Sequence, residues 1–124
     1  MPARVYACST EDSSALKKLM EYDPYLDNSL NEQQLTQLRS DEQANIIFAR
    51  QDYSIKDGIS ISLDPKKYYL YLSASDEFLE KADKKLKASI KSIERADKDT
   101  EAKVISLVES ERQESEQGLG LIFG

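Results

Sequence analysis

The sequence predicts an α+β fold, a two-layer sandwich in which helices cover a mostly antiparallel sheet of about four or five strands. Apolar residues alternate in some segments and recur every three or four positions in others, which are the periods of strands and helices. The strand-like segments cluster, which gives the order β-α-α-β-β-β-α-α-β. The chain has 124 residues, 40% of them hydrophobic and 32% charged, which suits one domain over residues 1–124.

The first third of the chain predicts one strand and two helices. Residues 4–8 are β-branched, aromatic or small, as in a short strand. Ser9 and Thr10 then offer capping oxygens to a helix that ends before Pro24, because the residue before a proline avoids the helical region. Ser29 and Glu32 have the spacing of a capping box, which predicts a second short helix to about residue 40.

Three strands are expected in the middle of the chain, at residues 44–53, 59–63 and 68–72. The first contains an apolar run typical of a strand buried on both faces, and the second alternates isoleucine and leucine with serine. Turn signals separate them: Gly58 follows Asp57, and Pro65 follows Asp64. Gly58 is expected there because glycine tolerates a positive φ. These segments predict an antiparallel meander, although the sequence leaves the strand order open.

A long amphipathic helix is predicted to begin near Ser75. Its apolar residues step by three and four positions and share one face: Leu79, Ala82, Leu86, Ile90 and Ile93. Residues 97–100 are a plausible break before a further helix, so residues 76–117 are read as either one helix or two. Gly118 is expected to end the helical region, and residues 119–123 are expected to form a final strand.

Charge and composition argue against several functional classes. Seventeen basic and twenty-three acidic residues give a net charge of −6, which disfavours contact with phosphate backbones. The chain lacks histidine, the usual general base and metal ligand, and it has no calcium-loop spacing, so no metal and no cofactor is predicted. No apolar run approaches the ~20 residues of a membrane helix. A single cysteine fits a reducing compartment, and we expect a cytoplasmic protein.

The junction between the first strand and the first helix is the candidate ligand site. Cys8, Ser9 and Thr10 lie where backbone N–H groups gather at a helix start and would lower the pKa of a thiol. Without histidine the usual cysteine–histidine dyad cannot form, so a small buried hydrophobic role for Cys8 is the competing interpretation. No residue is assigned a catalytic role, and the sequence favours a non-enzymatic protein.

Tyrosines on neighbouring predicted strands suggest a further alternative. Aromatic rings beside basic residues on an open sheet face can stack nucleotides. The residues concerned are Tyr53, Tyr68, Tyr69 and Tyr71, with Arg50, Lys66 and Lys67 nearby. Strand periodicity places Tyr68 on the face opposite Tyr69 and Tyr71, and the usual RNA-binding strand signature is missing. A weak nucleic-acid binder is therefore the least favoured hypothesis.

The leading hypothesis is a non-enzymatic protein-interaction or assembly module that self-associates or binds a protein partner. Residues 109–117 contain no apolar side chain, yet an apolar segment follows them. Such a segment, as an edge strand, invites pairing with a second copy. The predicted interaction surface is Leu119, Leu121, Ile122 and Phe123. A small-ligand-binding domain or enzyme, with its site at the first strand–helix junction, is the main alternative.

Overall fold

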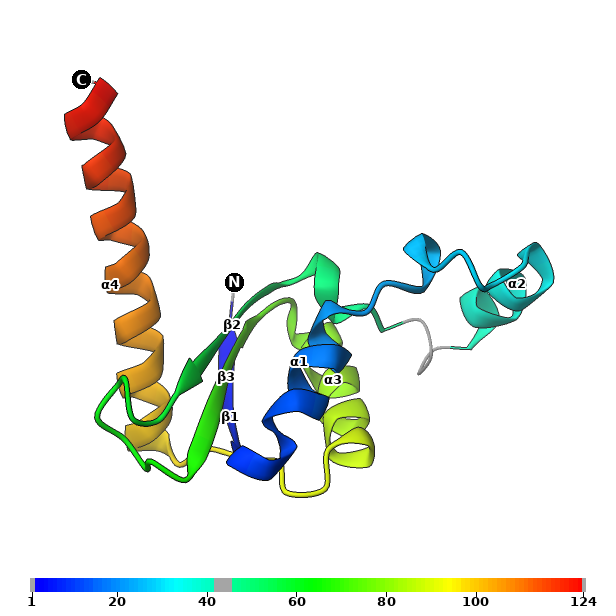
Figure 1. The fold of residues 1–124 in the computed structure, drawn as a ribbon, viewed down its shortest axis with the longest axis horizontal. Helices are drawn as coiled ribbons and strands as arrows, with labels where there is room; N and C mark the ends of the chain where they lie inside the picture. Colours follow the sequence, from blue (N-terminus) through cyan, green and yellow to red (C-terminus); the bar gives the residue numbers. More distant parts are fainter. Residues whose placement is uncertain (1, 42–45, 124) are drawn as a thin grey trace.

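The computed structural model describes the backbone of residues 2–41 and 46–123, and the side chains of residues 2–41 and 46–114. Within these ranges the chain forms an α+β sandwich around a four-stranded antiparallel sheet, as the sequence predicts (Figure 1). The strands lie in the order β2-β3-β1-β4. Their bounds are β1 (Ala3–Ser9), β2 (Asp52–Asp57), β3 (Lys67–Ser73) and β4 (Glu94–Arg95).

The connection of these strands is the β-α-β-β-α-β arrangement called ferredoxin-like. β2 and β3 form an antiparallel hairpin, and β1 enters the sheet beside β3, with Val5 opposite Tyr71. The short β4 pairs with the other side of β1 through Tyr6 and Ala7. β1 therefore occupies the interior of the sheet, where both of its faces can be covered.

Two helices cover one face of the sheet. α1 (Ser13–Glu21) and α3 (Asp76–Ser89) bury apolar stripes, as their periodicity predicts. Their side chains meet alternate residues of β1 and β3 in the first core. The contributing residues are Tyr6, Cys8, Leu16, Met20, Leu70, Leu72, Leu79, Ala82 and Leu86.

A third helix covers the opposite face of the sheet. α4 (Lys98–Phe123) places Val104 and Val108 against the other set of alternate strand residues (Figure 1). These are Val5, Ala7, Tyr69 and Tyr71, and each of them is buried. The sheet is thus buried on both faces over β1 and β3, and its strands read as nearly continuous apolar runs for that reason.

An arm extends from the body between α1 and β2. It contains η2 (Pro24–Leu26) and α2 (Glu32–Ser40), and α2 has no buried residue. Figure 1 shows this arm on one side of the molecule and the free end of α4 on the other. The predicted capping box shifts by two residues, because Asn31 caps the helix and the Gln34 side chain accepts from the backbone N–H of Asn31.

The predicted strand at residues 44–53 is wrong over residues 46–51, and only its last two residues belong to a strand. Residues 42–45 lie outside the described range, and η3 (Phe48–Arg50) follows them. Ile46 and Phe48 are buried in the first core, so their apolar run reflects burial beneath α1 and α3 rather than pairing in the sheet. The strand itself is β2, an edge strand of mixed composition that carries a weak apolar pattern.

Residues 59–63 form a turn instead of the predicted strand. Ser62 has a φ of 59°, the left-handed conformation that ends strand geometry. Ile61 and Leu63 pack against the buried cluster between the sheet and α4, which explains why they are apolar. Gly58 has no positive φ; instead, a Cβ there would collide with the backbone carbonyl of Asp64. Its role is close backbone approach.

The long helical region divides earlier than predicted and ends later. α3 ends at Ser89, where Ile90 turns extended, and β4 intervenes before α4 begins at Lys98. The predicted strand at residues 119–123 is wrong, because these residues continue α4. A glycine inside a helix costs only about 1 kcal/mol relative to alanine, so Gly118 is a weak stop signal. The self-pairing edge strand expected at Leu119, Leu121, Ile122 and Phe123 is therefore absent from the described backbone.

Candidate functional site

The structure brings Cys8, Ser9 and Thr10 into a set of internal contacts. Cys8 is 2% exposed in the first core, and burial, followed by the nearby Asp12 carboxylate, raises the pKa of its thiol to about 11. A thiol in this environment stays protonated at neutral pH and is a poor nucleophile. Burial of Cys8 as a small hydrophobic residue is confirmed.

Two backbone donors at this junction, the N–H groups of Ser9 and Thr10, already have partners within the protein. The N–H of Ser9 donates to Ser92 Oγ at 2.9 Å, and the N–H of Thr10 donates to the carbonyl oxygen of Lys66 at 3.1 Å. Asp12 accepts from both the N–H and the hydroxyl of Ser92, and these bonds hold its pKa below the usual range. An ionised carboxylate here opposes an incoming anion, and a ligand role for Cys8, Ser9 and Thr10 stays a prediction.

The tyrosine face of the sheet is covered. Tyr69 and Tyr71 are each 4% exposed beneath α4, and the Arg112 guanidinium lies 5.3 Å from the centroid of the Tyr71 ring. Tyr68 points to the opposite face, as predicted, and is partly buried beside the first core. Tyr69 and Tyr71 are therefore not open for base stacking in this conformation, whereas Tyr53 and Tyr68 are only partly buried.

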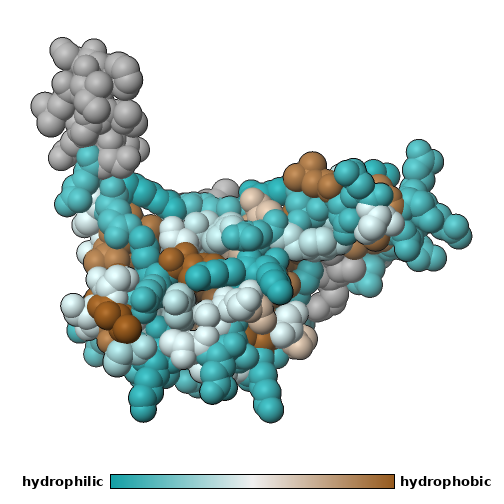
Figure 2. All heavy atoms as spheres, viewed as in Figure 1, coloured by the Kyte–Doolittle hydropathy of each residue, from teal (hydrophilic) through white to brown (hydrophobic). Residues whose placement is uncertain are grey.

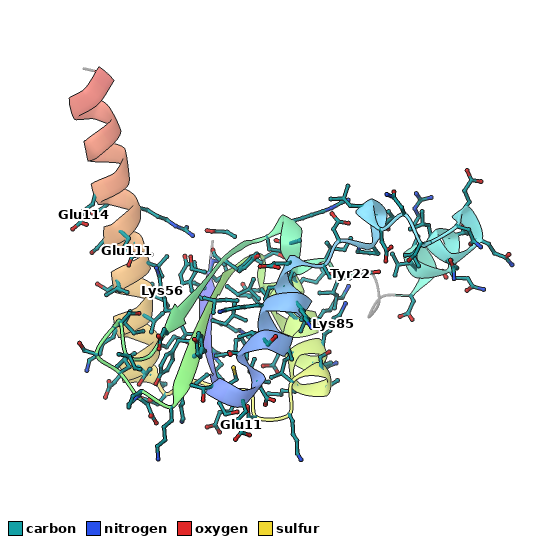
Figure 3. The ribbon with its side chains drawn as sticks, in the orientation of Figure 1. Glu11, Tyr22, Lys56, Lys85, Glu111 and Glu114 are labelled. Atoms are coloured by element: carbon teal, nitrogen blue, oxygen red, sulfur yellow. The ribbon has the colours of Figure 1, made fainter. Side chains whose placement is uncertain are left out.

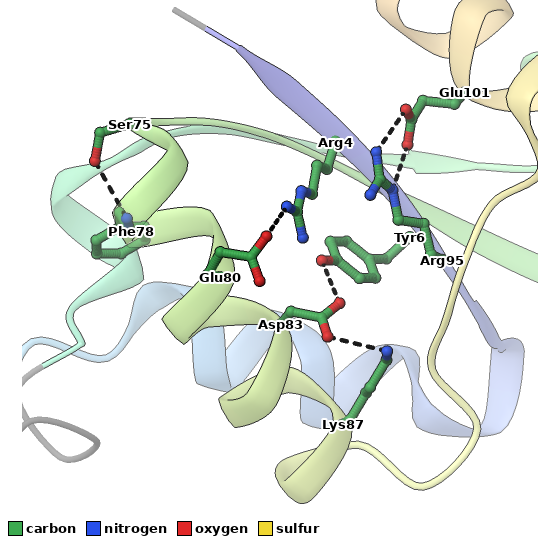
Figure 4. A network of polar contacts seen from close by, with 9 residues as sticks. All are labelled: Arg4, Tyr6, Ser75, Phe78, Glu80, Asp83, Lys87, Arg95 and Glu101. Atoms are coloured by element: carbon green, nitrogen blue, oxygen red, sulfur yellow. Dashed lines mark hydrogen bonds and ion pairs between the residues drawn. The ribbon is translucent and has the colours of Figure 1, made fainter.

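A polar network attaches the covering helices to β1 (Figure 4). The Tyr6 hydroxyl donates to Asp83 Oδ1 on α3 at 2.7 Å, and Arg4 pairs with Glu80 at 2.7 Å. Burial and the bond to Asp83 raise the pKa of Tyr6 to about 12. The charged groups drawn in this network face partners of opposite charge or hydrogen-bond partners, so the arrangement stabilises the fold.

α4 is attached to β2 by two ion pairs at the edge of the sheet. Lys56 Nζ lies 2.5 Å from Glu111 Oε2, and Figure 3 shows these two side chains facing each other. Arg112 donates through Nη1 and Nη2 to the two carboxylate oxygens of Asp52 while stacking on Tyr71. The side chains described beyond these pairs, up to Glu114, are exposed. The sheet therefore holds the first half of α4, and the second half continues past it (Figure 1).

A groove of about 640 Å³ lies beside this attached half, between α4 and the turn after β2. Its walls are mostly apolar or small: Ile61, Leu63, Val104, Ser106, Leu107 and Ser110. Figure 2 shows apolar residues gathered at the base of α4, and Ile59 in the same turn is 68% exposed. The groove is open to solvent, and its walls are mostly apolar. Sequence reasoning missed it, because residues 59–63 were assigned to a strand.

A second pocket of about 570 Å³ lies where the arm joins the body. It is lined by Tyr25, Arg39, Ile47, Arg50, Gln51 and Phe78. These residues come from η2, α2, η3 with its flanking residues, and the first turn of α3, so no local motif unites them. The sequence contains no signal for this site, because the topology alone brings the two arginines together.

Searches against protein-family models, curated proteins and solved structures find no match for this chain. No helix in the described parts of the chain combines the length and apolar character needed to cross a membrane.

Proposed function

We propose that this protein is an assembly module that self-associates through α4. The apolar groove at the base of α4 is the observation that supports this proposal. We assign its occupant as the apolar end of α4 from a second copy of the chain, which contains Leu119, Leu121, Ile122 and Phe123. The surface predicted from sequence is retained, with a helix in place of a strand.

The geometry of α4 explains why the occupant comes from another molecule. Leu107 in the groove and Leu119 belong to the same continuous helix, twelve positions and about 18 Å apart along its axis. A helix is rigid over this length and cannot fold back onto itself. The apolar end therefore reaches a groove of this type only on a neighbouring copy.

The spacing of apolar residues along α4 also favours contact through its far end. Leu119 follows Val108 by eleven positions, about three turns, and Ile122 follows Val104 by eighteen, about five turns. The pattern of the face that covers the sheet is thus repeated beyond the sheet. Burying a leucine, isoleucine or phenylalanine side chain contributes about 1.5–3 kcal/mol. Several such residues are needed, because association costs about 4–15 kcal/mol.

A two-fold dimer uses both copies of the contact. In such a dimer each α4 end enters the groove of the other subunit, so the apolar burial occurs twice within one closed assembly. Each chain carries a net charge of −6, so the two copies repel each other at low ionic strength. Salt screens this repulsion, and we expect association to strengthen as salt is raised.

Light scattering coupled to size exclusion tests the proposal on the full chain. The unmodified protein is expected to elute as a dimer, and Leu107→Asp or Ile122→Asp is expected to give a monomer. Leu26→Asp is the matched control. It also replaces an aliphatic side chain with a carboxylate, but Leu26 lies on the arm, where it is 77% exposed. Circular dichroism checks that each variant keeps its helices.

A monomeric mass for the unmodified protein at about 0.5 mM would contradict the proposal, since specific interfaces of ordinary size associate well below that concentration. A dimer that persists in both Leu107→Asp and Ile122→Asp would equally exclude α4 as the contact.

A further inference from the structure

The pocket at the root of the arm carries a second inference that is independent of self-association. Tyr25 lines this pocket, and two guanidinium groups approach its ring. The Arg50 guanidinium carbon lies 4.9 Å from the ring centroid, and that of Arg39 lies 5.6 Å from it. Stacking on an aromatic ring fixes the plane of a guanidinium and leaves its edge donors available to a ligand.

One carboxylate holds this arrangement in place. Asp23 accepts from Arg50 Nε at 2.9 Å and from the backbone N–H of Tyr25 at 3.0 Å. The bond from Arg50 keeps the pKa of Asp23 below its usual range, so this carboxylate stays ionised at neutral pH. The orientations of Arg50 and Tyr25 are thereby fixed before any ligand arrives, which lowers the entropy cost of binding.

The charges around the pocket favour an anion. Two arginines, Arg39 and Arg50, line the pocket, and one carboxylate, that of Asp23, pairs with Arg50. Lys85 lies on α3 (Figure 3), where it donates to the carbonyl oxygen of Ile46 at 2.9 Å. The local balance is positive in a chain whose net charge is −6. Two guanidiniums within one pocket attract an entering oxyanion.

The other wall of the pocket is apolar. Ile47 is 7% exposed, and the ring of Phe78 packs edge-on against Phe48 with centroids 6.2 Å apart. Gln51 adds an amide that can donate or accept a hydrogen bond. The volume of about 570 Å³ falls within the range of small-molecule sites, which combine apolar walls with a few converging polar groups.

We propose that this pocket binds a small organic oxyanion, a phosphate or carboxylate attached to an apolar or aromatic body. The planar fork of Arg39 matches carboxylate and phosphate geometry and receives the oxyanion. Arg50 donates through Nε and Nη2 to Asp23 and adds its remaining N–H donors and its charge. The body of the ligand lies against Ile47 and Phe78. Because the pocket and the α4 groove share no lining residue, either proposal can fail without the other.

The test is an NMR titration of the full-length protein with phenyl phosphate, benzoate and the uncharged benzyl alcohol. Phenyl phosphate or benzoate is expected to shift the amide signals around Tyr25, Ile47 and Gln51, with a Kd on the order of 1 mM for so small a ligand. Benzyl alcohol is expected to leave these signals in place. The stronger of the two anions identifies whether the natural ligand carries a phosphate or a carboxylate.

Two arginine variants separate a built site from general attraction. Arg39→Gln is expected to weaken binding at least 10-fold, since each charge-assisted hydrogen bond contributes strongly where water is partly excluded. Arg112→Gln is the matched control, because Arg112 also stacks on a tyrosine and pairs with an aspartate, but at the α4 edge. It is expected to change the Kd by less than about two-fold.

The proposal would be overturned if neither anion shifted these amide signals at about 10 mM. A Kd above that concentration is too weak for a specific small-molecule site. An equal weakening by Arg39→Gln and Arg112→Gln would overturn it as well, since it would show that net charge alone attracts the probes.

Discussion

The chemistry of individual residues in this protein is governed by burial. Tyr6 and Cys8 are alternate residues on the same face of β1, and burial raises the pKa of both groups. In each case the protonated form is stabilised, so neither side chain offers a charged group at neutral pH. The sequence allowed either a reactive or a buried Cys8, and the packing of α1 and α3 over β1 decides for burial.

Cys8 is expected to resist alkylation in the folded protein. At pH 8 a thiol with a pKa of about 11 is about one part in a thousand thiolate, against about one part in four for an ordinary cysteine. Iodoacetamide labelling followed by mass spectrometry measures this, with the protein in urea as the fully reactive reference. The double variant Cys8→Ser/Thr10→Cys is the control, because Thr10 is exposed and a thiol there should react rapidly. Equal labelling of Cys8 and the Thr10→Cys thiol would contradict the buried position.

Glu101 is expected to contribute to stability in a pH-dependent manner. It accepts from the N–H of Val5 at 3.0 Å and from the Arg95 guanidinium. Burial by itself would raise the pKa of Glu101, but these hydrogen bonds outweigh burial and hold the pKa below its usual range. A lowered pKa in the folded state gives stability that is complete above the unfolded value of about 4.3 and is lost as the pH falls through the folded value.

Urea unfolding of Glu101→Gln at pH 7 and pH 3 tests this linkage. The variant is expected to lose about 1–3 kcal/mol at pH 7, the range for hydrogen bonds to a charged group, and distinctly less at pH 3. Glu77→Gln is the matched control, because Glu77 is an exposed carboxylate whose partner is Lys81 on the same helix. A loss for Glu101→Gln that is the same at both pH values would refute the assigned role.

At the scale of elements, the sequence predicts those helices and strands whose apolar side chains recur at a regular spacing because they pack into a core. β1, β3 and α1 appear where the sequence places them, and α3 appears with its apolar stripe intact. Each of them buries a regular set of side chains in a core, and a regular period is therefore imposed on its sequence.

Other segments escaped prediction for identifiable reasons. β2 is an edge strand in which Tyr53 and Ile55 alone pack against the first core, so its pattern is weak. In the turn at residues 59–63, apolar residues alternate with serines as they do in a strand. Ile61 and Leu63 are apolar because they pack beneath α4, whereas Ile59 is exposed. Neither candidate pocket was predictable, since each is formed by residues that only the tertiary fold brings together.

The turn after β2 depends on Gly58. Its N–H donates to the carbonyl oxygen of Lys67 at 3.0 Å, and its own carbonyl accepts from Leu63 at 2.9 Å. A Cβ at this position meets the backbone of Asp64, which cannot move without breaking the turn. Gly58→Ala is expected to destabilise the protein by about 1–3 kcal/mol, the usual cost of overpacking a tight site.

Thermal unfolding measures the effect of Gly58→Ala, with Ser60→Ala as the control in the exposed part of the same turn. A melting temperature for Gly58→Ala equal to that of the control would contradict the close approach. Because this turn forms one wall of the α4 groove, a destabilised turn is also expected to weaken self-association.

At the scale of the whole molecule, α4 performs two tasks. Its first half completes the burial of the sheet through Val104 and Val108, and two ion pairs fix its direction at the β2 edge. Its second half extends beyond the sheet, where the sequence becomes apolar again at residues 119–123. The buried contacts supply most of the stability of this attachment, because surface ion pairs contribute about 0–1 kcal/mol each. In the proposed assembly, the second half of α4 in one copy packs into the groove beside the first half of α4 in the other copy.

The most direct measurement is an isotope-filtered NOE experiment on a mixture of labelled and unlabelled protein, which detects contacts between copies alone. The account predicts intermolecular NOEs that link the methyl groups of Leu119 and Ile122 in one copy to those of Leu63 and Leu107 in the other. At about 0.5 mM a specific dimer of ordinary interface size is expected to be formed. The absence of these NOEs from a mixed sample at that concentration would contradict self-association through α4.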